Sequence, residues 1–252
     1  MKLAYSTLFC MDYTPKEHIA FLKKHNAQGV EVRVNNDNTF THGDGMPITN
    51  IGSSICLRGY NESVLADAKK LIKSIEACNI KAMRVFLGNF CVKKDAPRQP
   101  IDHAGIVKML QEMCDCSKVE IWVETHNEYS TGKVLASLVK DVDRDNFKII
   151  WDIVHPIEEG ESPEDTLKYL GDRIAHVHIK DAKPHKEPIW HDYEYTPLGE
   201  GVLPIKKVVK LLENFGYDGY FSLEWESLWR DELKALSWSA DEIMSKFMEF
   251  MK

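Results

Sequence analysis

Several features are missing from this sequence, and each absence excludes a class of function. No run of about 20 apolar residues occurs, so no membrane span is expected. The first ten residues, Met1 to Cys10, hold too short an apolar run for a signal peptide and no small-residue cleavage site. Basic residues are outnumbered, with 32 Lys and Arg against 39 Asp and Glu, whereas nucleic-acid binding usually rests on a basic footprint. These absences predict a cytoplasmic protein that binds neither membranes nor nucleic acids.

Paired cysteine motifs are also missing. The six cysteines include no CxxC pair, and Cys114 and Cys116 are only two residues apart. This pattern indicates reduced, mostly buried thiols and argues against a zinc knuckle.

The chain does contain a regular alternation of strand and helix patterns over its 252 residues. Strands are predicted at Lys2–Phe9, Gly29–Val34, Asn50–Leu57, Lys81–Leu87, Val119–His126, Phe147–Asp152, 173–180 and Gly219–Glu226. Helices are predicted at 14–26, 61–78, 101–117, 131–140, from Ser162, at 204–215 and at 231–251. The segment from Asn35 to Asn50 shows no helical period, so the helix after the second strand is short or absent.

Strands that alternate with helices predict a parallel sheet, and eight units in about 250 residues match a (β/α)₈ TIM barrel. An open doubly wound sheet would need a glycine-rich turn after its first strand, and Thr7 to Asp12 contains no glycine. No linker divides the chain, so we expect a single α/β barrel domain over residues 1–252.

The seventh predicted strand carries the clearest chemical signal. His176, His178 and Lys180 share one face, while the other face is apolar. Polar groups inside a sheet need partners because unpaired burial costs several kcal/mol. We therefore expect His178 and Lys180 to face a metal, a carboxylate cluster or a bound ligand, unless this face is simply solvated.

Four of the predicted strands end in a possible metal ligand: Glu124, Asp152, His178 and Glu224. The carboxyl ends of the strands form the active face of a TIM barrel. Three carboxylates in one barrel mouth would repel each other, and a divalent cation would offset that repulsion. Oxygen ligands with one imidazole suit Mn²⁺, Mg²⁺, Co²⁺ or Zn²⁺.

Five segments in the second half resemble the sugar phosphate isomerase/epimerase family of the xylose-isomerase-like TIM barrel superfamily. They are Val123–His126, Trp151–His155, His176–Asp181, Leu198–Gly201 and Gly216–Trp225, and in the first half only Gly29–Arg33 adds to the match. The resemblance implies that Glu124, Asp152, His178 and Glu224 are metal ligands and that His155 binds substrate. It adds Lys180, Asp181 and Glu226 as candidates for the pocket. The sequence Val202-Leu-Pro204 departs from the family, which often has an acidic residue there.

These residues predict a metal-dependent sugar or sugar-phosphate isomerase or epimerase. The metal would polarise a ketose carbonyl and stabilise an enediolate as a Lewis acid. Glu124 and Glu224, the candidate catalytic residues, would remove the α-proton and deliver a proton to the opposite face. We expect a small sugar as substrate, and assembly as a homo-oligomer is compatible with the sequence.

Three other functions are compatible with the same residues. A dehydratase of a cyclitol or shikimate-like keto acid could use His126 as acid or base and Arg33, Arg58 or Arg84 to hold a carboxylate or phosphate, unless Arg33 and Arg84 only pair with barrel glutamates. An endonuclease-IV-like repair enzyme would need more histidines and a basic face. A non-catalytic sugar-binding protein would keep a vestigial site.

The long segment from Asp181 to Gly201 is predicted to be a loop that closes over the pocket. It follows a proposed ligand strand and is long for a connection from a strand to a helix. It carries Trp190, His191 and Tyr193, and a contact between surfaces or subunits is the alternative role.

Overall fold

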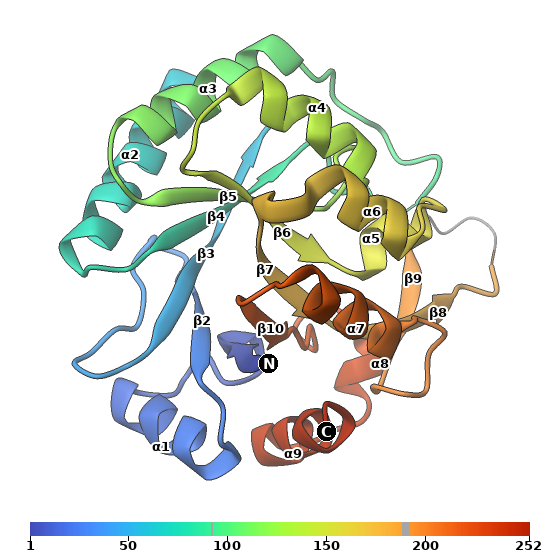
Figure 1. Ribbon diagram of the computed structural model, residues 1–252. Coiled ribbons are helices and arrows are strands. Elements are labelled where there is room, and N and C mark those ends of the chain that lie inside the picture. Colours follow the sequence, from blue (N-terminus) through green and yellow to red (C-terminus); the bar gives the residue numbers. More distant parts are fainter. Residues whose placement is uncertain (92, 188–191) are drawn as a thin grey trace.

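The computed structural model describes residues 1–91, 93–187 and 192–252. Eight parallel strands close into a barrel, and helices surround it (Figure 1). The barrel strands are β1 (Lys2–Ser6), β2 (Gly29–Arg33), β3 (Ile48–Leu57), β4 (Ala82–Leu87), β5 (Glu120–Glu124), β6 (Phe147–Asp152), β7 (Ile174–Ile179) and β10 (Tyr220–Leu223). Their order around the barrel is β1-β10-β7-β6-β5-β4-β3-β2. The predicted (β/α)₈ fold is therefore confirmed.

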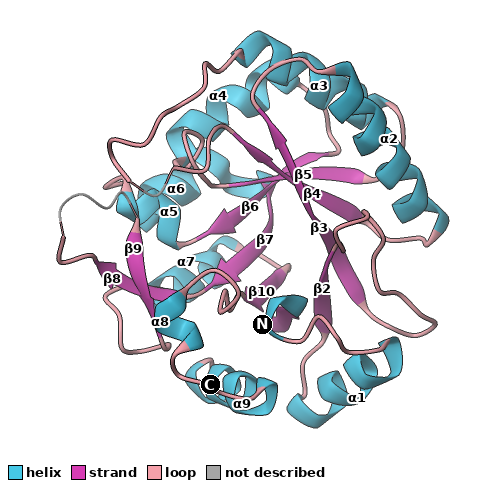
Figure 2. Cartoon of the chain, turned by 180° about the vertical axis from the view of Figure 1, so that it is seen from behind, coloured by secondary structure: helices cyan, strands magenta, loops and turns pink. Residues whose placement is uncertain are grey.

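The helices lie outside the strands (Figure 2). They are α1 (Pro15–His25), α2 (Glu62–Ala77), α3 (His103–Asp115), α4 (Gly132–Val142), α5 (Val154–Glu158), α6 (Pro163–Leu170), α7 (Ile205–Phe215), α8 (Asp231–Lys234) and α9 (Ala240–Phe250), with 3₁₀ turns η1 (Thr7–Phe9) and η2 (Gly171–Arg173). Thr14, Asn61 and Ser162 cap their helices as the sequence predicts. Pro204 precedes α7 without a side-chain cap, in keeping with the missing acidic residue.

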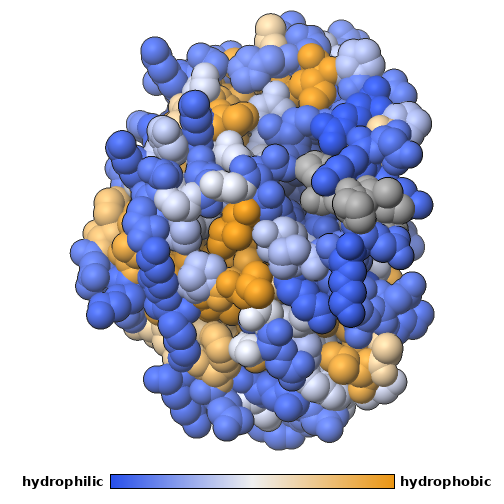
Figure 3. Space-filling model, turned by 90° about the vertical axis from the view of Figure 1, so that its right-hand side faces the viewer, coloured by the Kyte–Doolittle hydropathy of each residue, from blue (hydrophilic) through white to orange (hydrophobic). Residues whose placement is uncertain are grey.

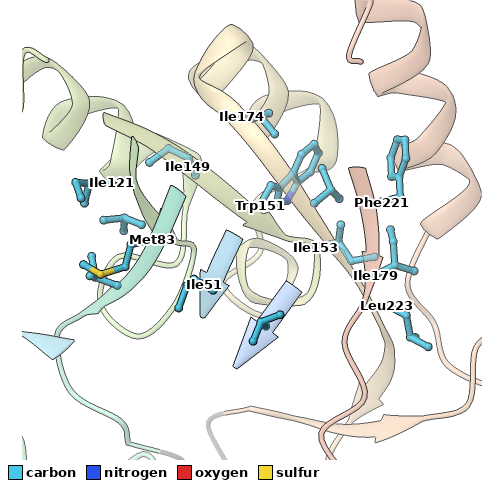
Figure 4. Close-up of a cluster of buried hydrophobic side chains, with 14 of the residues drawn as sticks. Ile51, Met83, Ile121, Ile149, Trp151, Ile153, Ile174, Ile179, Phe221 and Leu223 are labelled. Carbon is cyan, nitrogen blue, oxygen red and sulfur yellow. The ribbon is translucent and has the colours of Figure 1, made fainter. Parts of the chain in front are cut away.

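The main apolar core lies between the barrel and its helices. Each strand sends alternate side chains outward, and Ile51, Met83, Ile121 and Phe221 are among those buried in this layer (Figure 4). Buried apolar surface of this kind supplies most of the favourable free energy of folding.

A second, smaller apolar cluster fills part of the barrel interior. Ala82, Trp122 and Ile150 form it, and the Trp122 ring stacks on His176 with 5.6 Å between centroids. Two residues further along each of these strands, Arg84, Glu124 and Asp152 follow on the same inward side. The interior thus changes from apolar to charged toward the carboxyl ends of the strands.

The connections that follow β2 and β7 differ from each other in structure. Residues 34–47, all of them described, contain no helix, as predicted. The segment predicted as a long loop after β7 instead contains an antiparallel pair, β8 (Asp181–Pro184) with β9 (Tyr193–Thr196). Trp190 and His191, named there from the sequence, lie outside the described residues.

The predicted helix from Asp231 to Met251 is wrong, because the structure divides it into α8 and α9. Ser239 caps α9, and the Glu242 side chain accepts a hydrogen bond from the Ser239 backbone N–H in return. This Ser-x-x-Glu capping box is a helix-start signal that breaks the apparent continuity of the pattern. Ser237, with φ of 53°, turns the chain just before it.

Hydrophilic residues dominate the face shown in Figure 3, where apolar residues form separate patches. All six cysteines are free, but only Cys10 and Cys114 are buried, so the prediction of mostly buried thiols is wrong. Within the described residues, no helix is both long enough and apolar enough to cross a bilayer.

Candidate metal centre and substrate cavity

The four predicted metal ligands converge at the carboxyl end of the barrel. Glu124 and Asp152 are the last residues of β5 and β6, His178 is the penultimate residue of β7, and Glu224 directly follows β10. These four strands are consecutive neighbours in the barrel, with Glu124 and Glu224 at the two ends of the run. One ligand atom from each residue lies within 4.8 Å of all the others.

His178 stands at the centre of this group. Its Nδ1 lies 3.4 Å from Glu124 Oε1, 3.3 Å from Glu224 Oε2 and 3.9 Å from Asp152 Oδ2. Burial lowers the pKa of His178, but Glu224, Glu31 and Glu124 outweigh that effect and raise it well above the usual value. The imidazole therefore sits in a strongly negative field that would favour any cation.

Two cationic side chains already border the carboxylates. Arg84 Nη1 on β4 donates to Glu124 Oε2 at 2.5 Å and lies 3.7 Å from Glu224 Oε1. Lys180 Nζ lies 2.7 Å from Asp152 Oδ2 and 2.5 Å from Glu224 Oε2. Although burial opposes the charged form, Arg84 and His178 lower the pKa of Glu124 to about 2.

The group keeps donor atoms free for a metal ion. His178 Nδ1, Asp152 Oδ2 and Glu224 Oε2 are buried and lack a well-aligned hydrogen bond, although Lys180 forms ion pairs with the two oxygens. Buried polar atoms are normally hydrogen-bonded. Three carboxylates and one imidazole, with three such atoms pointing at one another, fit a divalent cation.

Glu31 is a candidate site residue that was not assigned a role from the sequence. It lies on β2, and its Oε2 is 2.7 Å from His178 Nε2 and 3.2 Å from His176 Nε2. Burial would raise its pKa, but the two histidines lower it well below the usual value. Gly52 leaves room for it, because a Cβ at that position would lie 3.1 Å from Glu31 Oε1. The signal in the sequence was its alternation with Val30 and Val32, which places it on the inward face.

His126 and His155 lie beside the metal-ligand group. Their ring centroids are 4.2 Å apart, and His155 Nε2 lies 3.7 Å from Asp152 Oδ2. His155 Nδ1 is hydrogen-bonded to Glu158 Oε2 at 2.8 Å. Burial and the neighbouring His155 lower the pKa of His126 to about 3. His126 faces the main cavity, whereas His155 lines only a small hollow of about 70 Å³ next to it.

The main cavity has a volume of about 420 Å³ at the barrel mouth. Its polar lining comprises Arg33, Ser54, Arg84, Glu124, His126, Glu224, Glu226 and Arg230. Its apolar lining comprises Leu8, Phe86, Phe90 and Trp229. A cavity with polar groups converging beside an apolar wall is typical of small-molecule sites.

Glu226 and Asp181, which were also predicted as pocket residues, lie in different surroundings. Glu226 lines the cavity, and its Oε1 accepts a hydrogen bond from Lys180 Nζ at 2.5 Å. Asp181 does not line the cavity: it accepts hydrogen bonds from the backbone N–H groups of Ala182, Gly199, Gly201 and Leu203. It is a structural anchor, and Gly201 is required there because a Cβ would lie 2.1 Å from Asp181 Oδ1.

The predicted roles of the arginines have separate outcomes. Arg84 pairs with Glu124 and also lines the cavity, so its role toward a substrate stays a prediction. Arg58 is exposed and is absent from the cavity lining among the described residues. Arg33 lies in the lining but has no such partner among these residues.

A protein-family model for the xylose isomerase-like TIM barrel matches residues 19–244. The chain belongs to the xylose isomerase-like TIM barrel family. A 3-dehydroshikimate dehydratase of Bacillus anthracis is 24% identical in an alignment 202 residues long, which covers 69% of this chain and 71% of that protein. An inosose dehydratase of Bacillus cereus is 29% identical in an alignment 116 residues long, which covers 40% of this chain and 39% of the relative. Matches to relatives of uncharacterised function from Methanocaldococcus jannaschii and Escherichia coli span 38% and 35% of their lengths.

Two solved structures share the same barrel. The IOLI protein with a bound zinc atom has a TM-score of 0.75 at 18% identity, covering 100% of this chain and 96% of that chain. A D-psicose 3-epimerase with D-tagatose, from Clostridium cellulolyticum H10, has a TM-score of 0.73 at 17% identity, covering 100% and 97%. At these identities the likeness shows the fold alone.

Proposed function

We propose that the protein is a divalent-metal-dependent enzyme that moves the proton beside the carbonyl of a hydroxy-ketone, acting as a sugar or sugar-phosphate isomerase or epimerase. One observation carries the proposal. Glu124 and Glu224 lie at the two ends of a four-ligand group in which three buried donor atoms lack a well-aligned hydrogen bond, and both line the 420 Å³ cavity. The IOLI structure with zinc and the D-psicose 3-epimerase, which share the fold, are in keeping with it.

Glu124, Asp152, His178 and Glu224 would hold the metal. When bound, it would supply a Lewis acid that polarises the carbonyl and stabilises negative charge on the neighbouring oxygens. The low pKa of Glu124 keeps its carboxylate ionised at neutral pH, the state in which it can hold a cation or accept a proton. Burial opposes the charged form of Glu224, but His178 and Lys180 lower its pKa well below the usual value. As the candidate acid at the other end of the ligand group, Glu224 would therefore take up a proton from solvent or substrate before delivering it to the opposite face.

Other side chains would bind and orient the substrate. Lys180, which is buried, and Glu226, which is partly buried, form an ion pair beside the ligands and offer donors and acceptors to hydroxyl groups. His126, with its pKa lowered to about 3, stays neutral and can act as both donor and acceptor. His155 contacts Asp152 and His126, so it would position these two side chains.

A dehydratase of a cyclitol or shikimate-like keto acid is the second candidate. It is favoured by the similarity to a 3-dehydroshikimate dehydratase over 71% of that protein and to an inosose dehydratase. Such an enzyme would remove the same α-proton and then expel a β-hydroxyl, with His126 in the cavity as the group beside the departing oxygen.

Proton NMR in deuterated water would test both candidates. The protein, loaded in turn with Mn²⁺, Co²⁺, Zn²⁺ or Mg²⁺, would be incubated with ketoses, ketose phosphates, inosose and 3-dehydroshikimate. Mn²⁺ samples would be quenched with a chelator before spectra are taken. An isomerase or epimerase would place solvent deuterium in its product, and a dehydratase would form a new C=C bond.

Glu124→Gln and Glu224→Gln should each lower turnover about 10²- to 10⁴-fold, since each removes a candidate acid or base. A variant that keeps the first base should still exchange the α-hydrogen while forming no product. Full retention of the migrating hydrogen during turnover would contradict the proton-transfer mechanism. Failure of the metal-loaded protein to exchange or turn over any member of the panel would count against both candidate functions.

A further inference from the structure

Arg33, the last residue of β2, occupies an unusual position in the wall of the main cavity. Its Nη1 donates to the carbonyl oxygens of Gly52 at 3.3 Å and Ser53 at 3.0 Å, and its Nη2 donates to Ser54 Oγ. The guanidinium carbon also lies 5.7 Å from the centre of the Trp229 ring. These contacts fix the side chain in one orientation before any ligand binds.

Arg33 forms no ion pair with a described carboxylate, although Glu224, Glu31 and Glu124 act on its charge from further away. Among the described residues, no carboxylate oxygen lies within ion-pair distance of Arg33, and no atom accepts a hydrogen bond from its Nε. The other two arginines of the cavity are paired, Arg84 with Glu124 and Arg230 with Asp192. Burial and the nearby Arg84 lower the pKa of Arg33 to about 10, which still leaves it charged at neutral pH.

The charge balance of the cavity points the same way. Its lining holds three carboxylates and three guanidiniums. Two of these guanidiniums are held in ion pairs, so Arg33 is the lining arginine best placed to meet a negatively charged substrate. Guanidinium groups bind carboxylates and phosphates through paired, charge-assisted hydrogen bonds.

We propose that Arg33 binds an oxyanion of the substrate, a carboxylate or a phosphate, at the β2 side of the cavity. The inference rests on the proposed function for the identity of the substrate but not for the binding itself. Trp229 and Ser54 hold the guanidinium in place, and Glu124 and Glu224 of the proposed ligand group line the same cavity. The acidic group of the substrate would therefore meet Arg33 while its carbonyl meets the ligand group.

Binding of two matched pairs of probes to the metal-loaded protein would test this inference. Calorimetry would compare 3-dehydroshikimate with its methyl ester for the carboxylate, and D-fructose 6-phosphate with D-fructose for the phosphate. In at least one pair, the wild-type protein should bind the charged member about 10- to 100-fold more tightly, the range expected for hydrogen bonds to a charged group. The pair that shows the preference identifies the oxyanion.

Arg33→Gln should abolish the preference while leaving the neutral member of that pair unaffected. Arg33→Lys, which keeps the charge but not the paired donors, should retain part of it. Arg58→Gln is the matched control, because Arg58 is an exposed arginine just after the neighbouring strand β3. It removes the same charge and should leave the preference intact.

The proposal is overturned if neither pair shows a preference or if a preference survives in Arg33→Gln. Metal content and circular dichroism of each variant would verify that the fold and the metal site persist. If the preference is lost in Arg33→Gln but deuterium exchange fails with every substrate, this inference stands and the proposed chemistry falls. If deuterium exchange occurs but neither anionic probe is preferred, the proposed chemistry stands and this inference falls.

Discussion

The two halves of the barrel contribute different chemistry to the same cavity. In the second half, β5, β6, β7 and β10 supply the four candidate metal ligands from consecutive strands. In the first half, β2 and β4 supply Glu31, Arg33 and Arg84, which contact those ligands or face the cavity. The second half thus offers the atoms that would hold a metal. The first half adds charged side chains that would orient those ligands and select the substrate.

The two halves meet at one side chain. His178 turns Nδ1 toward the three carboxylates of the second half and Nε2 toward Glu31, 147 residues earlier in the chain, at 2.7 Å. Histidines that bind a metal commonly donate their other ring N–H to a carboxylate, which fixes the tautomer and the ring orientation. We therefore expect substitutions of the ligands in the second half to change metal binding directly. Substitutions in the first half should change it only indirectly, through His178.

The largest effect is expected from Asp152→Asn in the second half. The amide loses the negative charge at Oδ2, so metal affinity should fall by more than about 100-fold, beyond the range found when only a supporting residue is changed. Metal titration by calorimetry and elemental analysis would measure it. Asp145→Asn is the control, because this exposed aspartate precedes the other end of β6. Equal metal content in wild type and Asp152→Asn would contradict the assigned site.

Glu31→Gln, in the first half, should have a smaller effect. Without the carboxylate, His178 loses the partner that favours the Nε2–H tautomer, and metal affinity should fall about 10- to 100-fold. The same calorimetric titration applies. The control is Glu120→Gln, since Glu120 is also a strand glutamate but accepts from Trp122 Nε1 at 2.7 Å, away from the ligand group. An affinity unchanged from wild type would show that the halves are not coupled through His178.

The smallest effect concerns the change in the free energy of unfolding as pH falls. A histidine in each half should contribute to it, with opposite sign. Burial lowers the pKa of His18 in α1 to about 4, and Tyr5 Oη is 2.8 Å from its Nδ1. The unfolded chain therefore takes up this proton first as pH falls. The stability that His18 contributes is present above about pH 6.5 and is lost as pH falls toward 4, whereas the raised pKa of His178 acts in the opposite direction.

Urea unfolding of the metal-free protein at pH 7.5 and pH 6 would isolate the part due to His18. His18→Gln should lose less stability than wild type over this range, by about 1 kcal/mol. Because His178 is present in both proteins, its contribution cancels in the difference. A wild type and variant with the same pH dependence would show that His18 is not held neutral.

Much of the second half could be predicted from sequence because its signals are local. Each candidate ligand ends a strand, and the barrel fold alone brings strand ends together, so Glu124, Asp152, His178 and Glu224 could be grouped without a structure. The site roles of these residues remain predictions. The signal that separates α8 from α9 was also local, because it is the Ser239–Glu242 capping box. The apolar period that runs across both helices was more conspicuous.

The role of Glu31 could not be predicted in the same way. The alternation of β2 placed it on the inward face, yet its partner depends on the closure of the barrel and on the register of β2 against β3. Asp181 was misassigned because sequence cannot distinguish a carboxylate that faces a cavity from one that binds backbone N–H groups. The β8–β9 pair was missed because its four-residue strands are too short for a clear period.

The spacing of Glu31 and Arg33 has a consequence for redesign of this barrel. They are two residues apart on one strand and so point to the same side, with Arg33 one step nearer the opening. On the proposed roles, Arg33 could be exchanged to accept a neutral or cationic ligand while Glu31 continues to support His178. β2 would thus be a short exchangeable segment in which ligand selectivity could change without disturbing the proposed metal site.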